Sequence, residues 1–588
     1  MAGKICIRRL LIMRFRGLED LKWNPDPGMN VILGGGDCGK TTILEAIGLL
    51  FSPSNSNALV ESDFHDRDYD RGFEIEAVVS VSDGAVFSAG GKIYWPWKWD
   101  GEDAVQPDAD DQSDPVTEHF FRVSVTATPD FDLAWEIIQP DGTRESFPVS
   151  LRRQIGLVRL GAEDKSDRDL RLVFGSALDR LISDDSLRAR ISSEIAKISL
   201  HDQVGAEGKA ALKTLDQNLD EAALPSDLSI GLTGSQGVTI GSLVGLFAKR
   251  RAVSLPLTSW GTGTRRMVAM HVAAAQKDEA SLITIDEIER GLEPYRLRQF
   301  ISSLEKSPMQ AFVTTHSPVA IAAALKAQLW FLDLEGHIGR LDRDKIKSQQ
   351  ERDPETFLAR LPVLTEGETE QGLVQELLRI AFAGNPLDAG TRVCLAQGNQ
   401  QLRNLLKQLV GAGLKVAAFA DDEGDSGQTW TDLKTKMNDC LFRWASGCTE
   451  EYILALMPDD YLENLFRDAD GDPEPYRLKS VQDRLGATDK SFATLTATAT
   501  AKGVGLKQII IEAATGNCDG TDDKAIAKEW KKHARTWFKK ADGSGGRELL
   551  QHLKATNTWS AVEPTLRPFV NAVLRASGKP ELSVIDLP

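Results

Sequence analysis

Residues 29–51, MNVILGGGDCGKTTILEAIGLLF, decide the fold of the N-terminal half of the chain. The apolar run at 29–33 predicts a buried strand, and apolar residues recur at helical spacing over 41–51, which predicts a helix. Between the two, the segment from Gly34 to Thr41 fits the pattern G-x-x-x-x-G-K-[ST]. A glycine-rich loop between a strand and a helix is typical of a phosphate-binding loop.

The chemistry expected of this loop follows from its residue types. Glycines let the backbone wrap a phosphate and present N–H groups to it, and the following helix points its N-terminus at the anion. The Lys40 ammonium neutralises charge on the β- and γ-phosphates, and the Thr41 hydroxyl can ligate Mg²⁺. The residues assigned here to ATP and its Mg²⁺ are Gly34, Gly36, Asp37, Gly39, Lys40, Thr41 and Thr42.

Two further strand ends supply groups that an ATP site needs. LITIDE predicts a buried strand that ends in Asp286, which can hold the Mg²⁺ shell, and in Glu287, which can polarise the attacking water. In VTTHSP, His316 follows the apolar strand predicted at 311–315 and can sense the γ-phosphate. A lone histidine after a strand is normally structural, so the role of His316 depends on the motifs around it.

A second glycine-containing helix start lies between these elements. Residues 259–266 read SWGTGTRR, and RRMVAMHVAAA continues the segment as a helix. Serine and glycine at the start of a helix form an anion site, so Ser259, Gly261 and Gly263 are assigned to nucleotide binding.

These segments resemble the ABC-type ATPases, and within them the SMC and RecF-like repair branch and specifically the OLD (overcoming lysogenization defect) family. The resemblance is carried by IMRFRG around Arg16, the loop at 34–42, SWGTGTRR, IDEIERGLEP and TTHSP. It implies that Arg16 lies near the nucleotide base and that the signature segment of one subunit covers the ATP of another. A homodimer or a higher even oligomer is therefore expected. The signature departs from LSGGQ, and Ile288 stands where the family commonly has proline.

The order of predicted elements divides the chain into two α/β parts. Residues 1–345 are expected to form the ABC-type ATPase domain, with a helical insertion at about 166–225 that resembles the dimerisation element of OLD proteins. The polar segment KIKSQQERDPE, at 345–355, is the predicted boundary. Over 355–588, apolar runs alternate with helical patterns, which predicts a small parallel sheet.

Acidic residues follow two of the predicted strands in the C-terminal part. Glu366 and Glu370 come after the strand LPVL, and the segment ADDEGD, with Asp421, Glu423 and Asp425, comes after KVAAF. The carboxyl ends of neighbouring parallel strands converge, so these side chains are expected to share one site. Clustered carboxylates repel each other unless a cation lies among them, and hard oxygen ligands favour Mg²⁺ or Mn²⁺. Two such metals can bracket a phosphodiester and promote its hydrolysis.

This acidic pattern resembles the Toprim domain of topoisomerases, primases and OLD nucleases. Glu366 matches the glutamate after the first strand, with Glu370 one helical turn further on. Asp421 matches the first residue of the later D-x-D, whose second position is Glu423 here. Glutamate can ligate a metal from its longer arm, and Asp425 can share that task.

The same resemblance extends to two later segments. Glu450 or Glu451 opens a predicted helix and corresponds to a further acidic position of OLD proteins. WFKKADGSGGREL resembles the stretch that supplies a lysine to the cleaved phosphate, and either Lys539 or Lys540 fits. Both lie in the basic region 524–554, which is either an ordinary charged helix face or a surface that tracks phosphates.

Composition narrows the classes of function. The 588 residues include 69 basic and 86 acidic ones, for a net charge of −17 and a pI near 5.1. This balance excludes a protein that coats duplex DNA through a basic stripe, but not a nuclease with an acidic metal site. Six scattered cysteines without a CxxC pair indicate a reduced, cytoplasmic protein without a zinc knuckle. No apolar run approaches the roughly 18 residues of a membrane span, so a soluble protein is expected.

Together, the two patterns predict an ATP-binding, divalent-metal-dependent endonuclease that hydrolyses DNA phosphodiester bonds. The ATPase dimer is expected to gate the nuclease, and the OLD resemblance implies a role in anti-phage defence. Two other hypotheses stay open. One is an ATP-switched sensor or scaffold with a weak or inactive Toprim domain, acting through a protein partner such as the product of a neighbouring gene. The other is a nuclease directed at RNA, tRNA included.

Overall fold

The structure is a computed structural model. It describes residues 5–55, 58–82, 87–89, 92–107, 118–160, 246–250, 253–274, 281–422, 424, 427–467 and 472–588, with scattered positions between 171 and 213. The chain divides into two compact units, Met1–Asn30 with Thr41–Thr315, and Val31–Lys40 with His316–Pro588. The helical insertion predicted at 166–225 lies outside the continuous described segments.

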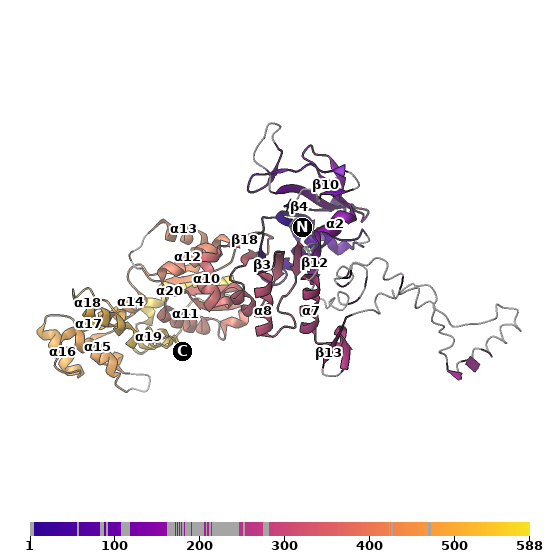
Figure 1. The fold of residues 1–588 in the computed structure, drawn as a ribbon. Coiled ribbons are helices and arrows are strands. Elements are labelled where there is room, and N and C mark those ends of the chain that lie inside the picture. The colour runs from indigo at the N-terminus through magenta and orange to yellow at the C-terminus, as the bar shows by residue number, and fades with distance from the viewer. Residues whose placement is uncertain are drawn as a thin grey trace. The chain divides into compact units, whose positions relative to one another are not determined.

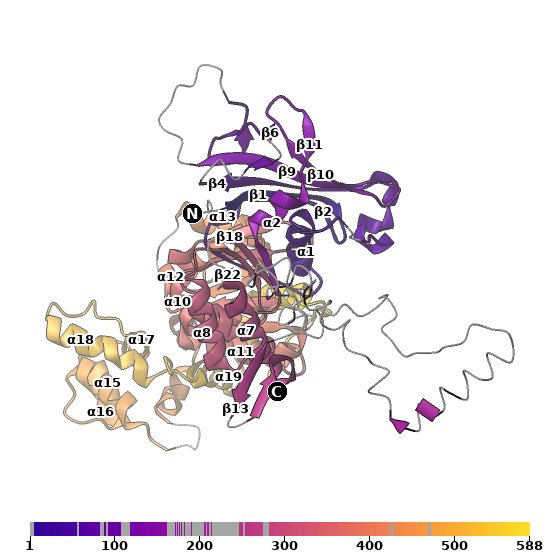
Figure 2. The same ribbon diagram turned by 45° about the vertical axis from the view of Figure 1, so that its right-hand side comes forward.

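An antiparallel sheet with the strand order β11-β10-β9-β4-β1-β2 belongs to the first unit (Figures 1 and 2). Its strands are β1 (Ile5–Phe15), β2 (Leu18–Trp23), β4 (Phe73–Val81), β9 (His119–Ala127), β10 (Leu133–Ile138) and β11 (Arg144–Ser146). The strands predicted at 5–15, at 73–82 and within 119–138 are confirmed. Small two-stranded ribbons follow, formed by β5 (Ser88–Ala89) with β6 (Lys92–Ile93) and by β7 (Lys98–Trp99) with β8 (Ala104–Val105).

Three strands of the first unit pair in parallel, and two of them precede residues predicted to act on ATP. β12 (Leu157–Leu160), β15 (Leu282–Ile285) and β16 (Gln310–Thr314) pair in that order, and β15 and β16 are buried along their whole length. Continuous apolar runs are the expected sequence of such strands. The remaining elements are α1 (Lys40–Leu50), α2 (Val149–Ile155), α7 (Thr262–Ala274) and α8 (Pro294–Leu304), with the hairpin of β13 (Phe247–Arg250) and β14 (Val253–Pro256) before α7. β3 (Met29–Gly34) leads through the glycine-rich loop into α1, as predicted.

The second unit contains a parallel sheet with the order β20-β19-β21-β22. Its strands are β19 (Leu361–Thr365), β20 (Thr391–Leu395), β21 (Ala417–Ala420) and β22 (Leu441–Arg443). Before it come α9 (Pro318–Ala323), β17 (Gln328–Leu332), β18 (Ile338–Leu341) and α10 (Arg343–Arg352). Residues 345–355, where the domain boundary is predicted, form the end of α10 and a following turn inside this unit, and that boundary stays a prediction.

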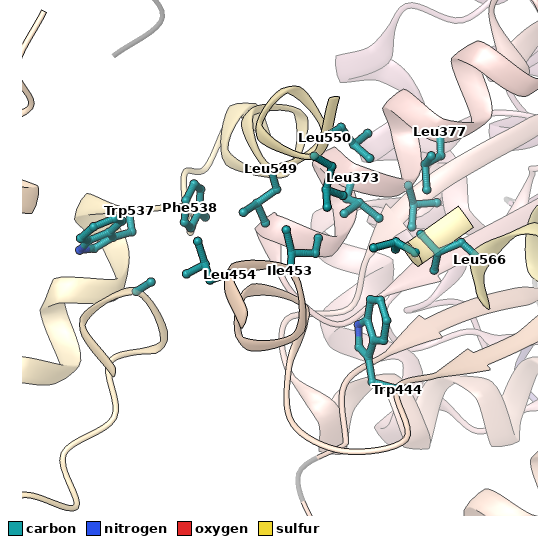
Figure 3. Packing of buried hydrophobic residues seen from close by; sticks show 14 of the residues in the cluster. Leu373, Leu377, Trp444, Ile453, Leu454, Trp537, Phe538, Leu549, Leu550 and Leu566 are labelled. Atoms are coloured by element: carbon teal, nitrogen blue, oxygen red, sulfur yellow. The ribbon is translucent and has the colours of Figure 1, made fainter. Parts of the chain in front are cut away.

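Helices cover and extend this sheet. The first group consists of α11 (Glu368–Ala381), α12 (Asn399–Gly411), α13 (Gln428–Met437) and α14 (Thr449–Ala455). The second group, coloured orange to yellow in Figure 1, consists of α15 (Pro475–Leu485), α16 (Phe492–Ala501), α17 (Leu506–Thr515), α18 (Lys524–His533), α19 (Ser544–Ala555) and α20 (Trp559–Ala576). One hydrophobic core runs through both groups, and Leu373, Ile453, Trp537 and Leu549 lie in it (Figure 3).

Glycines let α11 and α19 pack backbone to backbone. A Cβ on Gly372 would lie 1.8 Å from the carbonyl oxygen of Gly543, and a Cβ on Gly546 would lie 2.1 Å from that of Thr369. No side chain fits at such distances. The GSGG segment therefore brings the chain just after Lys540 against the helix that carries Glu370.

In the described part of the chain, we find no helix with the length and apolar character that crossing a membrane requires.

Candidate functional site

The glycine-rich loop has the backbone that its sequence requires. Asp37 and Gly39 adopt positive φ angles of 60° and 97°. A Cβ on Gly34 would lie 2.5 Å from the carbonyl oxygen of Leu332, so only glycine fits there. The buried Lys40 ammonium donates hydrogen bonds to the carbonyl oxygens of Gly34, at 3.0 Å, and Gly35, at 2.5 Å. The lysine is thus held over the loop that would cradle phosphates.

The side chains of Thr41 and Asp286, both assigned to Mg²⁺ from the sequence, are in contact. The Thr41 hydroxyl donates to the Asp286 carboxylate at 3.2 and 3.3 Å. The Thr314 hydroxyl also donates to this carboxylate, at 2.6 Å, and accepts from the N–H of Glu287 at 2.9 Å. Glu287 itself has a φ of 47°, which is uncommon for a residue other than glycine and is often found at functional turns.

Arg266 and Thr314 are site residues that sequence reasoning did not assign. The buried Arg266 guanidinium donates to the backbone oxygen of Asp286, and desolvation lowers its pKa. Both residues stand inside quoted motifs, SWGTGTRR and VTTHSP. Their place inside these motifs was the signal available in the sequence. Only the fold shows that both residues contact Asp286.

The other residues predicted for nucleotide binding lie as follows. The Ser259 hydroxyl donates to Pro256 O at 2.7 Å, and neither it nor Gly261 hydrogen-bonds to Thr41 or Asp286 in the described structure. A Cβ on Gly263 would lie 2.0 Å from the carbonyl oxygen of Gly291, so this glycine serves close packing.

Arg16 belongs to the first unit and His316 to the second. The Arg16 guanidinium forms an ion pair with Asp63 at 3.0 Å, next to His65, whose Nδ1 lies 2.8 Å from Arg16 O. His316 is exposed and lines a cavity of about 450 Å³ together with Gly34 and Gly36. Thr42 follows Thr41 in the first turn of α1.

The predicted carboxylates converge in the second unit. Glu366 follows β19 and Asp421 follows β21, and these strands are parallel neighbours. The Glu366 Oε2 atom accepts from the Asn399 amide at 3.1 Å and from the N–H of Asp421 at 3.3 Å. The Asp421 Oδ1 atom accepts from the N–H and the hydroxyl of Thr449, both at 3.1 Å. The second carboxylate pair joins them from the helices α11 and α14.

Glu370 and Glu450 bring buried oxygens without donors into this cluster. Thr369 donates to Glu450 Oε1 at 2.6 Å, but the buried Glu450 Oε2 and Glu370 Oε1 atoms have no hydrogen-bond partner among the described residues. Glu450 is fully buried and Glu370 is 2% exposed. A buried carboxylate oxygen without a donor costs free energy that a bound cation would remove.

The pKa shifts of these residues also indicate that a cation would stabilise the cluster. Burial and then the charges of Glu370 and Glu450 raise the pKa of Asp421 to about 9. Burial and then the Glu450 charge raise the pKa of Glu370 to about 8. Burial followed by the charges of Glu450 and Asp421 also raises the pKa of the Cys448 thiol. A set of oxygen ligands that raise each other's pKa fits a divalent cation such as Mg²⁺ or Mn²⁺.

Two lysines that the sequence could not separate lie in different surroundings. Desolvation alone would lower the pKa of Lys539, but the charges of Glu450 and Glu370 outweigh it and raise that pKa. Lys540 instead forms an ion pair with Glu548 at 3.3 Å. The charge of the carboxylate cluster therefore acts on Lys539, whereas Lys540 is held in an ion pair with Glu548.

The remaining acidic candidates divide in a similar way. Glu450 is buried in the cluster, whereas Glu451 is exposed. Glu423 and Asp425 lie outside the described residues. Three supporting residues were missed by sequence reasoning, namely Thr369, Asn399 and Thr449. All three are polar residues beside a predicted acid or at the start of a helix, which is a weak signal because surface helix starts look the same.

Comparison with known proteins gives a family match for residues 29–322. A family model described as "AAA domain, putative AbiEii toxin, Type IV TA system" matches residues 29–322, which is half of the chain. The chain belongs to this AAA-domain family. The matched residues contain the loop, Asp286, Glu287 and His316. Family membership and the geometry of the loop together support an ATP-binding ATPase domain.

Solved structures match this chain at low identity and with low TM-scores. An Smc head domain with an extended coiled coil, bound to the C-terminal domain of ScpA and derived from Pyrococcus furiosus, is 13% identical over 59% of this chain and 99% of its own, with a TM-score of 0.33. The recombination mediator protein RecF of the RecFOR pathway, with ATP, is 14% identical over 58% and 100%, with a TM-score of 0.31. None of the curated proteins matches with significance.

Proposed function

We propose that this AAA-domain protein is an ATP-binding, divalent-metal-dependent endonuclease that hydrolyses phosphodiester bonds in DNA. The observation that carries the proposal is the convergence of Glu366, Glu370, Asp421 and Glu450 at the carboxyl ends of a parallel sheet that follows an ATPase domain in the chain. The charges of Glu450, Glu370 and Asp421 in this cluster also favour the charged form of Lys539, whose pKa is raised. The Toprim domain expected from the sequence is this second α/β part, and the OLD resemblance gives the proposed combination of domains.

The roles of the residues follow from their surroundings. Glu366, Glu370, Asp421 and Glu450 would hold one or two Mg²⁺ or Mn²⁺ ions, with Glu423 and Asp425 as further candidates. Such ions supply a site with a nucleophile at neutral pH and with positive charge opposite a phosphate. Thr449 and Asn399 fix the carboxylates of Asp421 and Glu366. The Lys539 ammonium would stabilise negative charge that develops on the cleaved phosphate.

The ATPase part of the proposal rests on the loop. ATP would bind at Gly34, Gly36, Asp37, Gly39 and Thr42, with Lys40 on its phosphates and Thr41 and Asp286 around its Mg²⁺. Glu287 would activate the water for ATP hydrolysis and His316 would sense the γ-phosphate. Ser259, Gly261 and Gly263 would act on the ATP of a second subunit, and Arg16 would lie near the base. We therefore propose a homodimer or higher even oligomer in which ATP gates the nuclease.

The biological setting is part of the same proposal. The matched family is described by a toxin of a type IV toxin–antitoxin system. A nuclease under nucleotide control suits such a role or a role in anti-phage defence, with a protein partner encoded nearby. The proposed location is the cytoplasm, where ATP and the nucleic-acid substrate occur.

The test is cleavage of supercoiled plasmid by the full chain in Mg²⁺ or Mn²⁺, with and without ATP. Glu366→Ala is expected to reduce cleavage by at least about 1000-fold, since loss of a metal ligand removes several kcal/mol of transition-state stabilisation. Glu368→Ala is the matched control, because Glu368 belongs to the same motif but is only half-buried and is expected to leave cleavage nearly unchanged. Lys40→Ala is expected to remove only the effect of ATP.

Three outcomes would contradict this proposal. If Glu366→Ala and wild type cut equally, the cleavage comes from elsewhere. If plasmid stays intact with every metal while tRNA is cut in a Glu366-dependent manner, the substrate is RNA. If neither is cut, the ATP-switched sensor that acts through a partner becomes the better hypothesis.

A further inference from the structure

Cys448 lies directly beside the carboxylate cluster. It is the N-cap residue of α14, a position that serine, threonine, aspartate, asparagine and glycine usually occupy. Its side chain does not cap the helix. Its Sγ atom and one carboxylate oxygen each of Asp421 and Glu450 all lie within 4.8 Å of one another. A thiol and two carboxylates therefore point to one small volume.

A second observation at this point indicates a ligand. Glu450 is fully buried, and Thr369 occupies its Oε1 atom. Its Oε2 atom has no hydrogen-bond donor in the described structure. Both hydrogen bonds from Thr449 to Asp421 go to the Oδ1 atom. Among the residues that the structure describes, no second protein donor reaches the other oxygen of either carboxylate, so each keeps one oxygen for a cation.

The spacing of these three atoms fits a metal site. Around a tetrahedral Zn²⁺, sulfur and oxygen ligands lie about 3.6 Å apart, given metal–sulfur and metal–oxygen distances of about 2.3 and 2.1 Å. The observed spacing of up to 4.8 Å needs only small side-chain rotations to reach that value. Cys448 is half-buried and forms no disulfide, so its sulfur remains available.

We propose that Cys448, Asp421 and Glu450 form a mixed sulfur–oxygen site that binds thiophilic dications, Zn²⁺ above all, more tightly than Mg²⁺. The inference rests on the proposed carboxylate metal site and adds its selectivity. A soft thiolate favours Zn²⁺ and Cd²⁺, whereas Mg²⁺ takes oxygen ligands almost exclusively. On binding, the sulfur gives up its proton to solvent and the metal–sulfur bond takes its place.

The site has a functional consequence. Asp421 and Glu450 belong to both ligand sets, so a dication held by Cys448 competes with Mg²⁺ for these two carboxylates. Zn²⁺ at low concentration therefore inhibits Mg²⁺-supported cleavage in wild type, and this inhibition requires the sulfur. Cys448 in this way makes the proposed nuclease sensitive to the supply of thiophilic metal.

The experiment is a titration of the purified, metal-free full chain with Cd²⁺, followed by the ultraviolet thiolate-to-Cd²⁺ charge-transfer absorption. Wild type is expected to develop this absorption with one equivalent, and Cys448→Ser is expected to lose it and to bind Cd²⁺ at least about 100-fold more weakly. Cys440→Ser is the matched control, because Cys440 is also half-buried in the second unit. It is expected to behave as wild type.

Mg²⁺ binding separates a lost ligand from a damaged fold. Cys448→Ser is expected to keep its Mg²⁺ affinity within about threefold, as measured by calorimetry, because Mg²⁺ does not use the sulfur. Equal Cd²⁺ absorption in wild type and Cys448→Ser would overturn the inference, and so would a parallel loss of Mg²⁺ and Cd²⁺ affinity.

The two proposals fail in distinguishable ways. If wild type cleaves plasmid with Mg²⁺ but shows no Cys448-dependent absorption, the nuclease stands and the sulfur site is wrong. If the absorption appears but no nucleic acid is cut, the metal site stands and the nuclease is wrong.

Discussion

Two groups of charged residues in the second unit have carboxyl pKa values that shift in opposite directions. Glu548 receives both guanidinium nitrogens of Arg477, at 2.6 and 2.8 Å, and a third contact from Lys540. Desolvation alone would raise the pKa of Glu548, but the hydrogen bonds from His552 and Arg477 lower it to about 2. In the carboxylate cluster, burial and neighbouring acids raise the pKa of Asp421 to about 9.

The difference lies in where the compensating positive charge comes from. Arg477 is fully buried, and it also donates to the backbone oxygens of Leu465 and Trp537. Its partners are complete within the chain, which is the pattern of a structural ion pair. The cluster around Glu370 keeps buried oxygens without donors, so its compensation has to arrive from solution. Charge is therefore compensated within the chain at one place, and at the other it fits the proposed metal site.

The largest expected effect comes from breaking the complete pair. Arg477→Met leaves the half-buried Glu548 without its bidentate partner and is expected to lower the free energy of unfolding by about 3 kcal/mol. Lys479→Met is the control on the same helix, because the Lys479–Asp483 pair is exposed and is expected to contribute less than about 1 kcal/mol. Urea denaturation followed by tryptophan fluorescence measures both. Equal, small losses in the two variants would show that Arg477–Glu548 is not structural.

A pH series examines the same pair from the acid side. Because folding lowers the pKa of Glu548, its contribution to stability is present above its ordinary pKa near 4.5 and is lost as the pH falls towards about 2. The difference in unfolding free energy between wild type and Glu548→Gln is expected to reach about 3 kcal/mol above pH 5 and to shrink steadily below about pH 4.5. A difference that stays constant with pH would contradict the lowered pKa.

Metal is expected to convert the cluster into a complete site. At a Mn²⁺ concentration about 100 times the dissociation constant, binding adds about 2.7 kcal/mol to the stability of wild type. Glu370→Gln removes one like charge, so in EDTA it is expected to be at least as stable as wild type, and in Mn²⁺ to gain less. Thermal unfolding of both proteins in EDTA and in Mn²⁺ measures this. If Mn²⁺ stabilises neither protein, the cluster is not a metal site.

Much of the architecture could be predicted from the sequence, because its signals are local. The loop at 34–41 and the strand before Asp286 each combine an apolar run with a distinctive polar end, and the structure has β3, α1 and β15 there. The acids after β19 and β21 converge for an equally simple reason, since these strands are parallel neighbours.

The rest depends on contacts between residues distant in sequence. Nothing in KK at 539–540 shows which lysine is affected by the Glu450 charge and which pairs with Glu548, because both acids are distant in sequence. Trp537 lies in the basic region and suggests a nucleic-acid contact by composition, but it is fully buried in the core. Cys448 carries no sequence signal at all, since its neighbour Asp421 comes from another strand.

Substitution of Lys539 or Lys540 is expected to give the smallest change in stability. These adjacent lysines also compare the carboxylate cluster with the Glu548 ion pair most directly. Lys540→Ala is expected to lower the unfolding free energy by no more than about 1 kcal/mol, because its ion pair is partly exposed and Arg477 remains on Glu548. Cleavage is expected to be unaffected. Lys539→Ala is expected to reduce metal-supported cleavage by about 100-fold or more, as for the loss of one charge-stabilising group, with a similarly small change in stability. Loss of cleavage in Lys540→Ala but not in Lys539→Ala would reverse the assignment and place the reacting phosphate on the side of Glu548.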